Sequence, residues 1–309
     1  MMRHRQRVQA AIVAAIGLLL SGCVSAAGSP DAEPSLGAIP QITSPDQVVF
    51  PIDSFLPSVD QTVALMLEGT SLVNACVQAG GGTSAATWSV ANPANSADMH
   101  PASQTDLFAV VSQYRQDGVT RSGWWGLFTD LATAAQVGYQ MAPGSKILAL
   151  DMDVNDPLVS DCVARVDAVS PGGSVTAQPV VNLLPDDGPQ YRPDDSRFVA
   201  VEQQWSACMK GQGFDYATPN DAIGSFTSPG GPTVTAVEKA TASADIQCKI
   251  QTNLVGIGVA VQSAYDQQYI DTHREQLAAL QTQIADYLAG RVQVPSQAPS
   301  TEQPVAIPS

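Results

Sequence analysis

Apolar residues recur three or four positions apart along most of the chain, which is the spacing of helices that bury one face. Ser58 and Gln61 have capping-box spacing and open one such helix, which the glycines at 80–82 end. Asp156 followed by Pro157 is a start signal for another. Further helices are expected over residues 104–113, 127–137 and 196–212.

The C-terminal third, from Val234 to about Leu288, is compatible with helix almost throughout, with a break or kink expected at 253–258. Residues 83–104 and 167–195 are instead rich in small, polar and turn-forming residues, and we predict irregular connections there. The pattern therefore predicts a mainly α domain with long irregular loops and a long C-terminal helix or helix pair.

The first residues follow the order of a bacterial lipoprotein leader. Three arginines are followed by an apolar run over 8–20 and then by Leu-Ser-Gly-Cys, which ends at Cys23. The run is too short for a stable membrane span. A plain cleaved signal peptide is the alternative, but it gives Cys23 no role. We expect residues 1–22 to be removed and Cys23 to carry the lipid, which would hold the chain to the cell membrane from outside.

Composition divides the mature chain into three parts. Residues 23–48 are rich in Ser, Ala, Pro and Gly, which is typical of a flexible stalk after the lipid. Residues 49–290 carry the helical pattern and form the expected extracytoplasmic domain. Residues 291–309 hold four prolines and no apolar period, which predicts a disordered tail.

A short echo within the domain raises the alternative of two similar halves, 49–167 and 190–290. Residues 72–80 and 205–213 both read as the end of an amphipathic helix, in which a cysteine comes shortly before a glycine. Either the halves share an ancestral unit, or the same device was used twice.

The chain is acidic. It has 309 residues, 44% of them hydrophobic, and a formal charge of −15. Removing residues 1–22 takes away three arginines and no acidic residue, so 11 basic and 29 acidic residues leave a charge of −18. This balance argues against nucleic acid and anionic lipid head groups as partners. We interpret the acidity as a source of solubility.

Besides Cys23 the chain has an even number of cysteines, which in an exported protein predicts two disulfides. Sequence leaves all three pairings open. There is no Cys-x-x-Cys pair, and His100 and His273 are isolated, so a zinc site is not expected. The four cysteines are Cys76, Cys162, Cys208 and Cys248.

One segment has metal-like spacing. Asp151, Asp153 and Asn155 match the opening of a calcium loop, but the sixth position is Asp156 instead of glycine, and the twelfth is Cys162 instead of glutamate. They are a weak calcium candidate only. We interpret the segment as a solvated loop in which Asp156 caps the next helix.

Two aromatic groups have a binding interpretation and a packing one, and we favour packing for both. Trp124, Trp125 and Phe128 have the form of a platform for a sugar or peptide, but such clusters are more often core. A stripe at i, i+4 and i+8 of the last helical segment could bind a partner or pack on the domain. Its members are Tyr265, Tyr269 and His273.

The chain lacks the hydrolase signatures Gly-x-Ser-x-Gly, Ser-x-x-Lys and His-Glu-x-x-His, and it has no phosphate loop or dinucleotide fingerprint. We therefore predict no catalytic residue and no cofactor. Asp130 and Asp161 are carboxylates of the kind that pair in glycosidases, but nothing in the sequence singles them out.

Two motifs carry a resemblance. Trp205-Ser-Ala-Cys208-Met, with Gly213 after it, and Ala-Asp245-Ile-Gln-Cys248 resemble the W-x-x-C-M-x-x-x-G and A-D-x-x-C helices of a group of uncharacterised secreted actinobacterial lipoproteins. The likeness covers about half of the chain, and Cys76 departs from it because Val follows it instead of Met. It implies a helical fold outside the cytoplasm and no particular activity. It also implies that Cys208 pairs with Cys248, which leaves Cys76 for Cys162.

Together these features favour a lipid-anchored cell-envelope protein that is a non-enzymatic binding or scaffolding module. Its expected partners are the membrane, through the lipid on Cys23, and an envelope protein or cell-wall polymer. The alternative is a cell-wall hydrolase or another envelope enzyme whose residues come together only in the fold. A transport-type ligand-binding lipoprotein is less favoured because few strand patterns are present.

Overall fold

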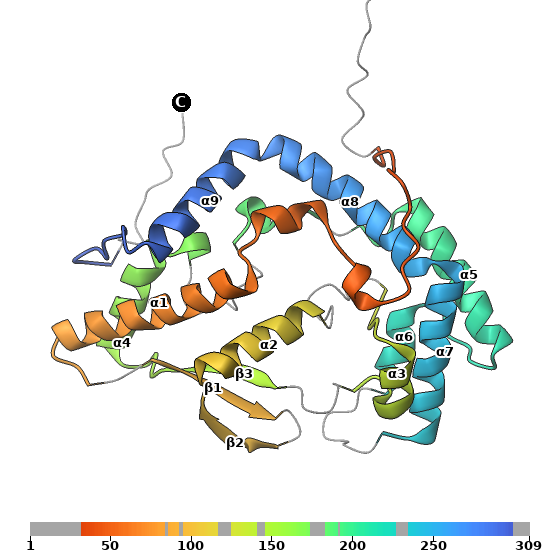
Figure 1. Ribbon diagram of the computed structural model, residues 1–309, viewed down its shortest axis with the longest axis horizontal. Helices are drawn as coiled ribbons and strands as arrows, with labels where there is room; N and C mark the ends of the chain where they lie inside the picture. The colour runs from red at the N-terminus through yellow and green to blue at the C-terminus, as the bar shows by residue number, and fades with distance from the viewer. Residues whose placement is uncertain are drawn as a thin grey trace, which may run out of the picture. The chain divides into compact units, whose positions relative to one another are not determined.

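The computed structural model describes residues 32–83, 86–92, 95–116, 125–140, 146–173, 183–190, 192–226 and 234–298 (Figure 1). The chain divides into two compact units, Met1–Glu33 and Pro34–Ser309. All of the helices and strands reported below belong to the second unit. The predicted signal peptide and Cys23 lie outside the described residues.

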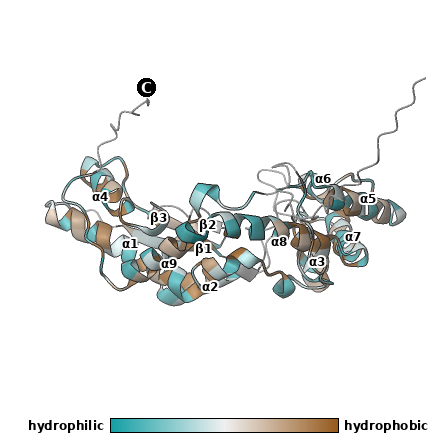
Figure 2. Ribbon diagram, turned by 90° about the horizontal axis from the view of Figure 1, so that it is seen from above, coloured by the Kyte–Doolittle hydropathy of each residue, from teal (hydrophilic) through white to brown (hydrophobic). Residues whose placement is uncertain are grey.

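The described part is mainly helical, as predicted. Its α-helices are α1 (Val59–Ala79), α2 (Gln104–Gln116), α3 (Leu131–Val137), α4 (Pro157–Asp167), α5 (Ser196–Gly211), α6 (Pro219–Gly224), α7 (Ala236–Thr252), α8 (Leu254–Thr272) and α9 (Arg274–Leu288). Short 3₁₀ turns are η1 (Pro45–Gln47), η2 (Pro51–Phe55), η3 (Pro171–Gly173) and η4 (Pro185–Asp187). Teal and brown residues alternate along the same helices in Figure 2, which is the pattern of helices that are apolar on one face.

Helix starts follow the predicted local signals. The Ser58 hydroxyl accepts a hydrogen bond from the Gln61 amide at 3.1 Å, and the Gln61 side chain accepts from the Ser58 amide at 2.9 Å, which completes the capping box. Asp156 caps α4 by accepting from the Leu158 amide at 2.8 Å. The cap of α5 is Asp195, which accepts from the Arg197 amide at 3.0 Å.

The C-terminal third is interrupted twice. Asn253 has φ 53° and ψ 35° and separates α7 from α8, within the break predicted at 253–258. Asparagine tolerates this left-handed conformation better than most residues. A second break at His273 separates α8 from α9, so three helices follow one another.

The loop predicted over residues 83–104 is wrong. β1 (Thr87–Asn92) and β2 (Asn95–Pro101) lie there, and with β3 (Ile147–Asp151) they form an antiparallel sheet of order β2-β1-β3. The central strand β1 buries four successive residues, while residues 97–100 of β2 are all exposed. Each strand does contain a short polar–apolar alternation, over residues 87–90 and 97–100, but the small and turn-forming residues around these runs favoured a loop.

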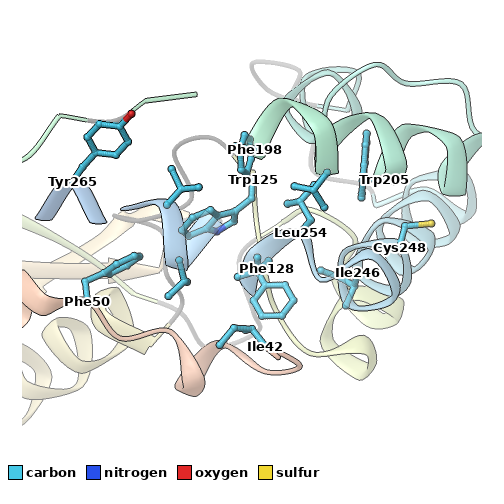
Figure 3. Close-up of a cluster of buried hydrophobic side chains, with 14 of the residues drawn as sticks. Ile42, Phe50, Trp125, Phe128, Phe198, Trp205, Ile246, Cys248, Leu254 and Tyr265 are labelled. Carbon is cyan, nitrogen blue, oxygen red and sulfur yellow. The ribbon is translucent and has the colours of Figure 1, made fainter. Parts of the chain in front are cut away.

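Within the described ranges, most buried apolar side chains belong to one of three clusters. The C-terminal core gathers residues of α5, α7 and α8, with Trp125 and Phe128 from the segment before α3 (Figure 3). The α1–α4 core lies between those two helices and includes Val73, Val77, Val159 and Val166. A third cluster joins α1 to β1 and α2.

Much of the predicted flexible stalk, residues 23–48, is packed. Residues 34–48, which we call the strap, bury Ile42 in the C-terminal core, where it is 2% exposed. Asn253 holds the strap, because its side chain accepts from the Ile42 amide at 3.2 Å and donates to the Pro40 carbonyl at 2.9 Å. Gly256 is required beside it, since a Cβ there would overlap the Pro40 oxygen. Because hydrogen bonds from Asn253 to the backbone hold the strap, its own sequence shows no periodic apolar pattern that would predict packing.

The tail predicted as disordered over 291–309 is also packed in its first part. Arg165 of α4 donates to the Pro295 carbonyl at 2.6 Å, and Val294 packs against the α1–α4 core. Residues 299–309 lie outside the described residues. Composition could not predict this contact, because the hydrogen bond goes to a backbone carbonyl of the tail and not to a side chain.

Candidate functional site

A group of buried polar side chains lies where α5 packs on α7. Cys208 and Cys248 form a disulfide there, with 5.7 Å between their Cα atoms. One turn earlier on each helix, the Trp205 indole N–H donates to Oδ1 of Asp245 at 2.9 Å. On both helices the disulfide comes one turn after the Trp205–Asp245 contact. The W-x-x-C and A-D-x-x-C motifs therefore face each other across the α5–α7 contact.

A buried ion pair continues this contact. Lys249, one turn after Asp245 on α7, places Nζ 2.7 Å from Oδ2 of Asp245 and 2.7 Å from the Leu127 carbonyl oxygen. Both side chains are 0% exposed. Burial raises the pKa of the Asp245 carboxyl, which hydrogen bonds from Lys249 and Trp205 oppose, and burial lowers the pKa of the Lys249 amine. Each shift favours the uncharged form.

Tyr139 and Glu238 border this pair. The Tyr139 hydroxyl is buried and makes no hydrogen bond of ordinary length to a described residue. Burial, and then the negative charge of Asp245, raises the pKa of this phenol. Glu238 accepts from the Tyr139 amide and the Gln140 side chain, each at 3.2 Å, and so ties the end of α3 to the start of α7.

The second disulfide joins α1 to α4 in apolar surroundings. Cys76 and Cys162 have their Cα atoms 5.7 Å apart, and Cys162 is fully buried. Both disulfides match the pairing that the resemblance implied. The predicted fold of disulfide-stapled helices is therefore confirmed.

The weak calcium candidate has a structural explanation. Asp153 accepts from the Asn155 amide at 3.0 Å, which is a local turn contact, and Asp156 caps α4 as predicted. Asp151 ends β3. In the part of the chain that the structure describes, no three His, Cys, Asp or Glu side chains are placed to hold a metal ion.

The aromatic cluster is core. Trp125 and Phe128 are 3% and 4% exposed, and the Trp125 ring stacks on Phe50 with 6.3 Å between centroids (Figure 3). Gly258 makes room for it, because a Cβ there would lie 2.6 Å from the indole. Trp124 falls outside the described residues. The packing interpretation is confirmed for the two residues that the structure shows.

The stripe on α8 also packs on the domain. The Tyr265 hydroxyl donates to Asp195 at 3.2 Å and the Tyr269 hydroxyl to the Pro185 carbonyl at 2.5 Å. His273 stacks on Tyr269 with centroids 4.1 Å apart, and its Nε2 lies 3.3 Å from Asp186. These contacts hold Pro185, Asp186 and Asp195 against the stripe.

The remaining candidate residues have separate structural roles. Asp130 caps α3 by accepting from the Thr133 amide at 2.9 Å, and these bonds lower the pKa of its carboxyl. Asp161 pairs with Arg165 at 3.3 Å on α4. His100 lies on the exposed strand β2. The described contacts join none of these three side chains to another.

Sequence reasoning missed the buried ion pair. The signal was present, because Asp245 and Lys249 are four apart and Cys248 lies between them on a face of small apolar residues. A charged pair at that spacing normally lies on a solvated face, so the polar residues were not expected in the core.

A groove lined by Leu183, Leu184, Pro185, Leu280 and Gln283 lies between η4 and α9, and no charged side chain lines it. No helix in the described ranges has the length and apolar character needed to cross a membrane. No family model, curated protein or solved structure matches the chain.

Proposed function

We propose that the protein is a lipid-anchored cell-envelope protein, attached through Cys23 and acting as a non-enzymatic binding or scaffolding module. The two disulfides carry the argument for its location. Disulfides form and persist in oxidising compartments, so the two bonds are consistent with an extracytoplasmic protein. The leader-like residues 1–22 support export by an independent route.

Because the strap is packed on the domain, only a short segment is left to link the lipid on Cys23 to the domain. Ten residues, 24–33, separate Cys23 from Pro34, whose carbonyl accepts from Arg197 at the start of α5. Fully extended, that length spans roughly 40 Å at most. An acylated Cys23 would therefore keep the domain close to the bilayer, and its partner would have to lie within that reach.

The use of the polar groups supports a binding module over an enzyme. Asp130, Asp156 and Asp195 cap helices, and His273 packs on Tyr269. Asp245 and Lys249 are fully occupied inside the core. A large helical body held by two disulfides is suited to presenting a fixed surface.

Fractionation of cells expressing Cys23→Ala tests the anchor. We expect the wild-type chain in the membrane fraction, labelled by a fatty-acid precursor, and the variant released without label. Ser25→Ala is the matched control and should stay membrane-bound. Tight membrane association of the unlabelled variant would contradict the anchor.

A second experiment tests the binding role. Cross-linking in intact cells should join the wild-type chain to a reproducible envelope component, and Cys23→Ala should lose that product because the tether holds the domain within reach. Purified protein that cleaved isolated cell-wall polymer would overturn the non-enzymatic proposal in favour of a hydrolase.

A further inference from the structure

Of the lysines that the structure describes, Lys249 alone is buried. A charged amine is rarely found fully buried in a protein core. Nζ contacts two oxygens, Oδ2 of Asp245 and the Leu127 carbonyl, each at 2.7 Å. A buried ion pair gives little net stability, because removing two charges from water offsets their attraction. Removing the two charges while keeping their hydrogen bonds would therefore stabilise the contact between Lys249 and Asp245.

We propose that Lys249 and Asp245 become joined by an intramolecular amide bond between Nζ and Cγ. The amide retains each hydrogen bond that the pair makes to its surroundings. Its carbonyl oxygen, the former Oδ1, still accepts from the Trp205 indole, and its N–H still donates to the Leu127 carbonyl. Two buried charges disappear, and no polar atom of the linkage is left without a partner.

The reaction is a condensation that needs no added oxidant or co-reactant. The neutral amine attacks Cγ of the protonated carboxyl, so the C–N bond forms and the bond from Cγ to Oδ2 breaks. A proton passes from nitrogen to the leaving hydroxyl, which departs as water. Burial favours both neutral reactants, since it raises the pKa of Asp245 and lowers that of Lys249.

Neighbouring groups are placed to assist. The Trp205 indole N–H donates to Oδ1, where negative charge develops during the attack. Positions one turn apart on α7 also hold the reacting groups together, which replaces a bimolecular encounter.

The chain provides an internal control. Lys146 and Asp106 form an ion pair at 2.5 Å, but their side chains are 38% and 20% exposed. Water stabilises the charged forms there, and hydrogen bonds from Lys146 and from the Ser103 hydroxyl and amide lower the pKa of Asp106, which keeps its carboxyl ionised. We expect no amide at this pair.

Tryptic peptide mapping of the reduced and denatured full chain tests the proposal. Trypsin does not cut after an acylated lysine, so a linked chain yields one peptide over residues 240–274 that is lighter by one water. An unlinked chain is cut after Lys249 and yields residues 240–249. Cleavage after Lys146 should be normal in the same digest.

Two variants distinguish this bond from other losses of water. Asp245→Asn should release ammonia and give the same linked peptide, while Lys249→Met should give no link. Complete cleavage after Lys249 in aged wild-type protein would overturn the proposal and leave a simple ion pair.

Discussion

The α1–α4 and α5–α7 helix pairs use the same covalent link in different surroundings. The Cys76–Cys162 bond lies among valines, and the two helices meet through apolar contacts. The Cys208–Cys248 bond lies one turn from the Trp205–Asp245 contact, with Lys249 buried beside it. A disulfide in an apolar contact mainly restricts the unfolded chain, whereas α5 and α7 are also held in one register by directional hydrogen bonds.

The comparison also explains the internal echo. In both regions a helix ends shortly after its cysteine, and a glycine with positive φ follows, Gly81 at 83° and Gly213 at 92°. Beyond this device the regions differ, because a β-hairpin follows α1 and a short helix, α6, follows α5. The shared feature is a way to end a stapled helix.

Removal of each disulfide should have the largest effect. For the 40-residue separation of Cys208 and Cys248 the chain-entropy model gives a loss of about 4 kcal/mol in the free energy of unfolding. The 86-residue separation of Cys76 and Cys162 gives about 0.7 kcal/mol more. Denaturant unfolding of the two double Cys→Ala variants measures both. A much larger loss at the α5–α7 pair would show that its hydrogen bonds depend on the disulfide.

Lys249→Ala should destabilise the protein by about 3–5 kcal/mol, because it leaves Asp245 buried without its partner. The double variant Lys249→Met with Asp245→Leu should recover most of that loss. Val166→Ala in the α1–α4 core removes two methyl groups and should cost only about 2 kcal/mol. Equal losses for Lys249→Ala and Val166→Ala, measured by urea unfolding, would remove the distinction between the two pairs.

Asp195→Asn should cost about 1.5–3 kcal/mol at neutral pH, because the carboxylate at the start of α5 binds Arg197 and Tyr265. Burial raises the pKa of Asp195, but the bonds and charge of Arg197 outweigh it and hold the pKa below its usual value. A lowered pKa gives stability that is present above the unfolded pKa of about 4 and is lost as the pH falls through the folded value.

Unfolding midpoints measured between pH 2 and pH 7 check this sign. The wild-type midpoint should fall on acidification more steeply than that of Asp195→Asn. Parallel acid limbs in the two proteins would show that Asp195 contributes no pH dependence.

Asp156→Ala, at the start of α4, should have the smallest effect, about 1 kcal/mol, because it removes one half-buried helix cap. Asp153→Ala should be near neutral, and calcium should not raise the melting temperature of the wild-type protein. A calcium-dependent rise that Asp153→Ala abolished would restore the calcium site.

Local signals in the sequence predicted the local structure. The caps at Ser58 and Asp156 and the break at Asn253 depend on residues within one or two turns, so sequence spacing was enough. The disulfide pairing came from the resemblance alone, because spacing left three options.

Long-range contacts account for what was missed. The strap is held by Asn253, more than 200 positions away. The burial of Lys249 was missed because a charged pair four residues apart normally lies on a solvated face, and its second partner, the Leu127 carbonyl, is 122 positions away. Such partners leave no periodic pattern in the segment itself.

The central claim is that the chain is exported, carries a lipid on Cys23 and forms two disulfides. Thiol counting on protein taken from its native cells tests this claim most directly, because the four other cysteines should be oxidised only if the chain is exported. The account predicts no free thiol in the denatured chain before reduction, four after it from the two disulfides, and Cys23 blocked by its lipid throughout. Free thiols at Cys76, Cys162, Cys208 and Cys248 before reduction, with residues 1–22 still attached, would contradict it.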